Sequence, residues 1–113
     1  MIELSKSQKK IARELINLGL QRECQSFKNE IEEFTSSLEW KDGNPQELYH
    51  KLADKVVRFD KHIGKRYNDL TGSRYFIAIL DLLHSKILTT EDIAQFDMEV
   101  QNEIMRVREF WDQ

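Results

Sequence analysis

The chain has 113 residues, of which 40% are hydrophobic and 33% are charged. That length allows one modest core, and the apolar content is too high for a disordered chain, so we expect a single domain over residues 1–113. Seventeen lysines and arginines against 20 aspartates and glutamates give a net charge of −3, which argues against a general nucleic-acid binder.

The sequence contains no run of about 18 apolar residues that could span a membrane. Its first residues, MIELSKSQKK, lack the uninterrupted apolar stretch of a secretory signal. Cys24 is the single cysteine, so the fold cannot depend on an intramolecular disulfide. We therefore expect a cytoplasmic protein without membrane contact.

A first helical segment is predicted from about Ser5 to Trp40. Ser5 followed by Gln8 resembles a capping box, in which side chains satisfy the free amides at a helix start. An apolar stripe with a mean spacing of about 3.5 residues follows, which is typical of a helix packed against another long helix. The stripe consists of Leu20, Cys24, Phe27, Ile31, Phe34 and Leu38.

The earlier part of this segment places most of its apolar residues on the opposite side of the helix. The helix either breaks or kinks at Gly19 or is covered on two sides, and residues 5–40 form either one helix or two. Coverage on two sides in so small a protein favours a partner chain. Two methionines of the last helix lie opposite its main stripe, and methionines often line partner-binding surfaces. The interface candidates are Leu4, Ile11, Leu15, Leu18, Met98 and Met105.

The stretch KDGNP marks the clearest boundary, because a turn signal precedes Asn44, a favourable N-cap, and Pro45, which suits a first helical position. The second helix has two apolar flanks. We expect it to end between Asn68 and Gly72, with one of these two residues in a left-handed conformation. The flanks are Leu48, Leu52, Val56, Phe59 and Ile63, and beside them Tyr49, Ala53, Val57, Gly64 and Tyr67.

Two further helices are predicted. The stretch SRYFIAILDLLHSKIL has apolar residues around most of the helical wheel, which indicates an enclosed helix. Thr89 is the predicted N-cap of the last helix, with Asp92 three residues on, and one apolar stripe continues to Trp111. Four helices with short connections and no strand predict an all-α fold, an antiparallel bundle of about four helices.

Candidate catalytic and metal sites are weak. His50 and Asp54 lie four residues apart but on the outer face of the second helix, and nothing completes a metal site, so we expect no metal and no cofactor. His84, inside an apolar arc, is a candidate base, although a partly buried histidine with a hydrogen-bond partner explains it better. Cys24 lies on a core stripe, where thiols are usually inert. No catalytic motif is found, and a non-enzyme is favoured.

A basic and aromatic cluster surrounds the connection between the second and third helices. It would suit an anion or a nucleic-acid backbone, and its members are Arg58, His62, Lys65, Arg66, Tyr67, Arg74 and Tyr75. Complementary charge within the chain explains it more simply. Asp60 and Arg66 lie near apolar surfaces and would need partners if buried. Arg66 or Arg74 could bridge to the acidic last helix at Glu99 or Glu103.

The leading hypothesis is a small cytoplasmic interaction module that contacts a protein partner, most simply a second copy of itself in a homodimer. The alternative from another class is an anion-binding or nucleic-acid-binding regulator that uses residues 58–75. An enzyme built on His84 or on Arg66, Tyr67 and Arg74 is the weakest alternative.

Overall fold

The computed structural model describes residues 2–111, and within them it contains helices and no strand, which confirms the all-α prediction. Four of the helices are substantial, and three short ones join or precede them. In chain order they are α1 (Lys6–Thr35), α2 (Leu38–Asp42), α3 (Pro45–Tyr67), the 3-10 turn η1 (Gly72–Arg74), α4 (Tyr75–His84), α5 (Thr90–Ile93) and α6 (Met98–Trp111). No helix among these is both long enough and apolar enough to cross a membrane.

The described residues form two compact units. One unit, here called the hairpin, comprises residues 22–68. The other, here called the small unit, contains the residues up to Gln21 together with those from Asp69 onward. The expectation of one domain over the whole chain, packed as one four-helix bundle, stays a prediction.

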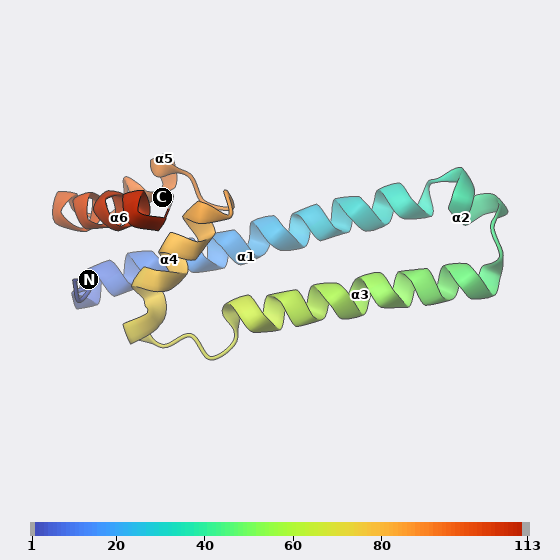
Figure 1. Cartoon of the computed structure of the whole chain (residues 1–113), viewed down its shortest axis with the longest axis horizontal. Coiled ribbons are helices and arrows are strands. Elements are labelled where there is room, and N and C mark those ends of the chain that lie inside the picture. The colour runs from blue at the N-terminus through green and yellow to red at the C-terminus, as the bar shows by residue number, and fades with distance from the viewer. Residues whose placement is uncertain (1, 112–113) are drawn as a thin grey trace. The chain divides into compact units, whose positions relative to one another are not determined.

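The hairpin consists of two antiparallel helices, the later part of α1 and the whole of α3, joined through α2 (Figure 1). The predicted stripe on α1 does face a second long helix, because the rings of Phe27 and Phe59 stack with centroids 4.2 Å apart. Asn44 is the N-cap of α3 as predicted, since its side-chain oxygen accepts hydrogen bonds from the amides of Gln46 and Glu47. The cap and Pro45 together fix where α3 begins.

Residues 5–40 form one long helix and a short second one. α1 is continuous through Gly19 and ends at Thr35, after which the Ser37 side chain caps α2. The opposed apolar residues at its start belong to the small unit, where Leu4, Ala12 and Leu15 are buried. The first part of α1 therefore packs within the small unit, and its later part packs against α3. The two opposed apolar faces of α1 are explained without a partner chain.

The end of α3 differs from the prediction in one respect. The residue in the left-handed conformation is Asp69, with φ of 61°, rather than Asn68 or Gly72. Aspartate tolerates this region better than most side chains do.

The small unit has the main apolar core. Its centre is α4, which contacts α6 and η1. Ile79 and Ile104 are fully buried, at 0% exposed, and Leu80, Leu82 and Leu83 are each 1% exposed, as predicted for an enclosed helix. α4 is shorter than predicted because the chain turns after His84, with Lys86 in a left-handed conformation at φ of 62°.

The predicted last helix is interrupted. Thr89 and Asp92 form the expected capping box, but α5 ends at Ile93, and α6 begins only at Met98. The Asp97 carboxylate accepts a hydrogen bond from the Val100 amide, and thus provides a second helix start that the apolar stripe did not reveal.

The start of α1 also differs in detail from the predicted capping box. Ser5 Oγ accepts a hydrogen bond from the Gln8 amide, which is half of the predicted arrangement. The Gln8 side chain is buried and accepts a hydrogen bond from the Asp97 amide at 2.9 Å instead of returning to Ser5. Gln8 thereby ties the start of α1 to the segment that precedes α6.

Candidate functional site

The hairpin contains one buried charged side chain, Glu23 on α1, which is only 8% exposed. Three donors from the end of α3 converge on its carboxylate. Oε1 is 2.6 Å from His62 Nε2 and accepts a hydrogen bond from Arg66 Nη1 at 2.9 Å. Oε2 accepts a hydrogen bond from the Tyr67 hydroxyl at 2.5 Å. We call these four residues the Glu23 cluster.

The helical spacing explains why these donors meet. Residues 62 and 66 are separated by one turn and share a face of α3, and Tyr67 reaches the second oxygen from the next position. On α1, Glu23 lies four residues before Phe27 and therefore on the side of the helix that faces α3. The cluster is thus part of the seam between the two helices.

The pKa of the Glu23 carboxyl lies below its usual range. Burial by itself raises this pKa, because it disfavours the charged form, but the other influences outweigh burial. They are the hydrogen bonds from Tyr67 and His62 and the positive charge of Arg66. Glu23 is consequently a carboxylate near neutral pH, held by its three partners.

The members of the predicted anion-binding cluster belong to both units of the chain. His62, Arg66 and Tyr67 are engaged with Glu23, and Arg58 pairs with Asp54 at 2.9 Å as the i,i+4 spacing predicts. Lys65 is exposed at the end of α3. The two other members, Arg74 in η1 and Tyr75 in α4, belong to the small unit.

Arg66 has a partner of opposite sign, as its position near an apolar surface required, since its side chain is only 17% exposed and pairs with Glu23. The sequence suggested that Arg66 or Arg74 bridges to Glu99 or Glu103 of the last helix. Glu103 pairs with Arg106. Asp60, the other residue singled out, is exposed and so needs no partner within the chain.

A signal for Glu23 exists in the sequence. At 100° per residue, a helix places position 23 within about 40° of Phe27 and about 20° of Phe34, on the stripe that faces α3. A charged residue on such a stripe requires a buried partner of opposite sign. The pairing itself was hidden, because 43 residues of chain separate Glu23 from Arg66.

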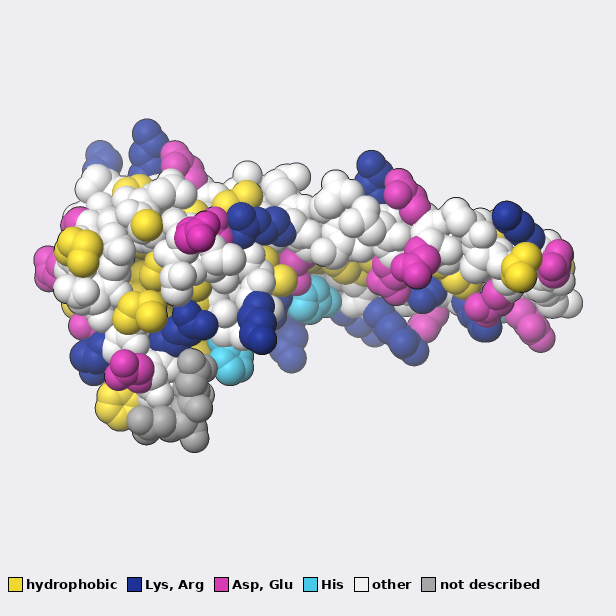
Figure 2. Space-filling model, turned by 90° about the horizontal axis from the view of Figure 1, so that it is seen from above, with side chains coloured by type: hydrophobic (Ala, Val, Ile, Leu, Met, Phe, Trp, Pro, Cys, Tyr) yellow, Lys and Arg dark blue, Asp and Glu magenta, His cyan; other side chains and the backbone are white. Residues whose placement is uncertain are grey.

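The two sides of the hairpin that flank this seam differ in chemistry. One side, here called the charged side, bears ion pairs: Lys55 with Glu30 at 3.2 Å, Arg58 with Asp54, and Lys51 with Glu39. The view from above in Figure 2 also shows acidic and basic side chains next to one another along the hairpin. This side is well solvated and needs no cover.

The other side, here called the apolar side, bears hydrophobic residues that water reaches. On α3 the side chains of Tyr49, Val56 and Val57 are 65%, 48% and 51% exposed. On a helical wheel of α3, these three residues and the partly exposed Ala53 lie between 60° and 160° from Phe59, all in the same direction of rotation. On α1 the corresponding positions are the exposed Cys24 and the partly exposed Ile31.

The hairpin is therefore a single layer of two helices with an incompletely covered core. Across residues 22–68, all of which are described, Leu48 is the only buried hydrophobic side chain. Phe27, Phe34 and Phe59 are each partly exposed although they lie in the seam. Two helices alone cannot enclose large side chains on more than one face.

The interface candidates from the sequence fall into two groups. Leu4 and Leu15 are core residues of the small unit, 6% and 1% exposed, and Ile11 and Leu18 are partly buried. Met98 and Met105 on α6 are 64% and 40% exposed. The exposed methionines are single residues on a helix whose main stripe is buried, which is common on protein surfaces.

The predicted environments of His84 and Cys24 were wrong. His84 is exposed at the end of α4, where its ring makes an edge-to-face contact with Trp111 at 6.3 Å. Cys24 is a free, exposed thiol, because no second layer covers the apolar side of the hairpin. Among residues 2–111 no group of three or more histidine, cysteine, aspartate or glutamate residues could hold a metal ion.

Searches with protein-family models, against curated proteins and against solved structures each found no match to this chain.

Proposed function

We propose that this protein is an interaction module that self-associates through the apolar side of its hairpin. Two copies would stack these sides against each other and convert two open two-helix layers into one four-helix bundle. The single exposed thiol of Cys24 suits a reducing compartment, and we therefore place this role in the cytoplasm.

One observation supports the proposal above all others: the hairpin has one buried hydrophobic side chain in 47 residues, counted from 22 to 68, while Tyr49, Val56 and Val57 remain about half or more exposed on one side. Packing this side against an equivalent surface would remove those side chains from water, at about 25 cal/mol per Å² of apolar area. Small helical units commonly gain stability by oligomerisation when their own core is thin.

A second copy is the favoured occupant because the apolar side is self-complementary in charge. Lys28 on α1 and Asp60 on α3 both lie on it, each about 100° around its helix from the phenylalanine of the stacked pair, Phe27 or Phe59. Each also lies one residue from that phenylalanine, so the two residues occupy nearly the same level along the hairpin.

This arrangement selects one symmetric geometry. If the twofold axis runs parallel to the helices, α1 of one copy lies over α3 of the other, and all neighbouring helices are antiparallel. Lys28 of each copy then meets Asp60 of the other copy, which gives two equivalent ion pairs across the interface. The Lys28 side chain is 67% exposed and its ion pair with Glu32, at 3.9 Å, is also exposed, so it is available for this role.

The test compares two aspartate substitutions on opposite sides of α3. Val56→Asp places a charge on the apolar side, and Lys65→Asp places the same residue about 180° away, nine residues later. Each substitution occurs twice in a symmetric dimer, so we expect Val56→Asp to raise the dissociation constant at least about 100-fold, while Lys65→Asp changes it less than about threefold. Sedimentation equilibrium from about 1 to 200 μM measures both.

A charge exchange tests the geometry. Lys28→Asp places two like charges against each other in each half of the interface and should weaken association, whereas Lys28→Asp combined with Asp60→Lys should restore it. A wild-type chain that stays monomeric up to 200 μM contradicts the proposal. Equal effects of Val56→Asp and Lys65→Asp would also contradict it, since association would then use another surface.

A further inference from the structure

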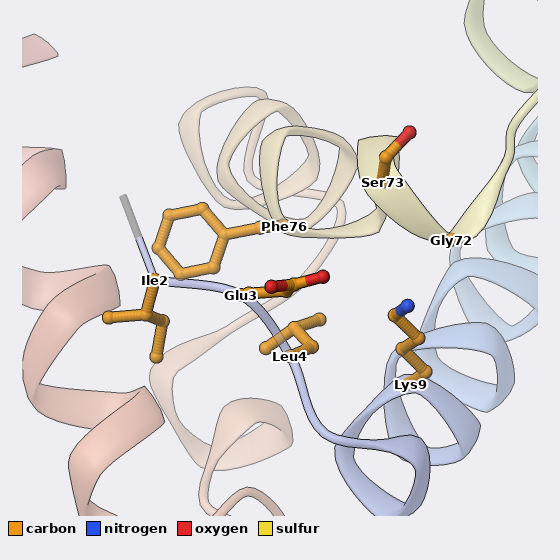
Figure 3. Close-up of a pocket in the computed structure, with 7 residues that line it drawn as sticks. All are labelled: Ile2, Glu3, Leu4, Lys9, Gly72, Ser73 and Phe76. Carbon is orange, nitrogen blue, oxygen red and sulfur yellow. The ribbon is translucent and has the colours of Figure 1, made fainter.

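The small unit contains a pocket of about 400 Å³, which lies within the size range of small-molecule sites. The beginning of the chain forms one wall, and η1 with the first turn of α4 forms the other (Figure 3). Its lining consists of Ile2, Glu3, Leu4, Lys9, Gly72, Ser73 and Phe76.

Two opposite charges face this pocket without neutralising each other. Lys9 and Glu3 form no ion pair with one another or with any other described residue. Figure 3 shows the Glu3 carboxylate and the Lys9 ammonium turned toward each other across the opening. The two charges are therefore both available to a molecule that enters the pocket.

Gly72 permits the position of Lys9. A Cβ atom at residue 72 would lie 3.3 Å from Lys9 Cδ and Cε and 3.4 Å from Nζ, closer than side chains normally approach. The missing side chain lets the lysine lie against η1 with its ammonium at the edge of the pocket. Beside it, the Ser73 hydroxyl shares a 3.0 Å hydrogen bond with Thr71, which leaves further hydrogen-bonding capacity on both oxygens.

The remaining wall is apolar. Phe76 and Leu4 are 5% and 6% exposed, and Figure 3 shows the Phe76 ring next to Ile2. A ligand that fills the pocket therefore meets a hydrophobic surface beyond the two charges.

We infer that this pocket binds a free α-amino acid with a branched aliphatic or aromatic side chain. Its carboxylate would pair with Lys9 and its ammonium with Glu3, while its side chain would contact Phe76, Leu4 and Ile2. A simple anion is repelled by Glu3 and a simple cation by Lys9, so a molecule with both charges beside an apolar group fits best. The inference is independent of self-association, because it uses the small unit alone.

L-leucine and L-phenylalanine are the probes, titrated into the full chain by isothermal calorimetry and by amide NMR. We expect saturable binding, with the largest shifts at the amides of Gly72 and Ser73. The leucine analogues 4-methylpentanoate, which lacks the ammonium, and 3-methylbutylamine, which lacks the carboxylate, should each bind at least about tenfold more weakly.

Two neighbouring lysines provide a matched control. Lys9→Met retains the length of the side chain and removes its charge, and should weaken leucine binding at least about tenfold. Lys10→Met makes the same change at an exposed position outside the pocket and should leave binding within about twofold. Glu3→Gln, at an exposed residue, gives a second test that does not depend on α1.

Three results would overturn the inference. They are an absence of saturable binding up to 10 mM of either amino acid, equal affinity of 4-methylpentanoate and leucine, or equal effects of Lys9→Met and Lys10→Met. A circular dichroism spectrum identical to that of the wild-type chain confirms that each variant is folded.

Discussion

Removal of the Glu23 carboxylate is the most informative single perturbation of the hairpin. Glu23→Ala removes the carboxylate that pairs with Arg66, whose side chain is 17% exposed, and also removes an acceptor from His62 and from Tyr67. Loss of one member of a buried ion pair costs about 3–5 kcal/mol in the free energy of unfolding. Because the His62 side chain is 44% exposed and can turn to water, we expect the lower part of that range, about 3 kcal/mol.

Glu23→Gln separates charge from shape. The amide retains one oxygen for Arg66 and His62 and loses the negative charge. Charge-assisted hydrogen bonds are about twice as strong as neutral ones, so we expect a loss of about 1–2 kcal/mol, smaller than that of the alanine variant.

The chain contains a matched control. Glu30 is also on α1 and also pairs with a cation on α3, Lys55, at 3.2 Å, but its side chain is 56% exposed. Exposed pairs contribute about 0.2–1 kcal/mol, so Glu30→Ala should destabilise the protein by less than about 1 kcal/mol. Urea denaturation followed by circular dichroism measures all three variants. Equal losses of unfolding free energy in Glu23→Ala and Glu30→Ala would show that burial does not make the ion pair of Glu23 stronger than the exposed one of Glu30.

The same cluster predicts a pH dependence with a defined sign. The pKa of Glu23 is lower in the folded chain than the value of about 4.3 expected for an unfolded one, so between these pKa values the unfolded chain binds more protons. The stabilisation is present above the unfolded pKa and is lost as the pH falls through the folded pKa. The difference in unfolding free energy between wild type and Glu23→Gln should therefore shrink as the pH falls below about 4.5. A difference that does not shrink in this acidic range would contradict the assignment.

Three further predictions concern other parts of the chain. Asn44→Ala removes the N-cap of α3 and should cost about 1 kcal/mol in urea denaturation, whereas Asn44→Gly should cost only a few tenths. Ile104→Ala, at a fully buried position, should cost about 2–5 kcal/mol, while its neighbour Met105→Ala, at 40% exposed, should change the same free energy by less than about 1 kcal/mol. Reaction of the exposed Cys24 thiol with a disulfide reagent should slow as protein concentration rises, and a rate independent of concentration would count against burial of the apolar side in a dimer.

The helical class and most of the helix starts are readable from the amino-acid pattern alone. Asn44 with Pro45 and Thr89 with Asp92 act through neighbours within three residues, so their capping is decided locally and is readable without a structure. The apolar faces of α1 were also readable, because burial of one face of a helix leaves a period near 3.6 residues, and the enclosure of α4 was readable from apolar residues around most of its wheel. The opposed faces along α1 were detected correctly, although their cause was not.

Features that depend on residues distant in sequence needed the tertiary structure. The interruption between α5 and α6 involves a hydrogen bond from the Asp97 amide to Gln8, 89 residues away, in addition to the local cap that Asp97 gives Val100. The partner of Arg66 was likewise undetermined, since acidic residues occur along the whole chain and a helical wheel gives direction without distance.

The exposure of Cys24 and Val56 shows the same limit most clearly. Periodicity identified both residues as members of apolar stripes. A stripe indicates only that burial of its side chains is favourable. The number of helices that pack over the stripe depends on the tertiary fold. Local interactions thus fixed where the helices form and which faces are apolar. Long-range packing decided which of those faces were covered within the chain and which remained open.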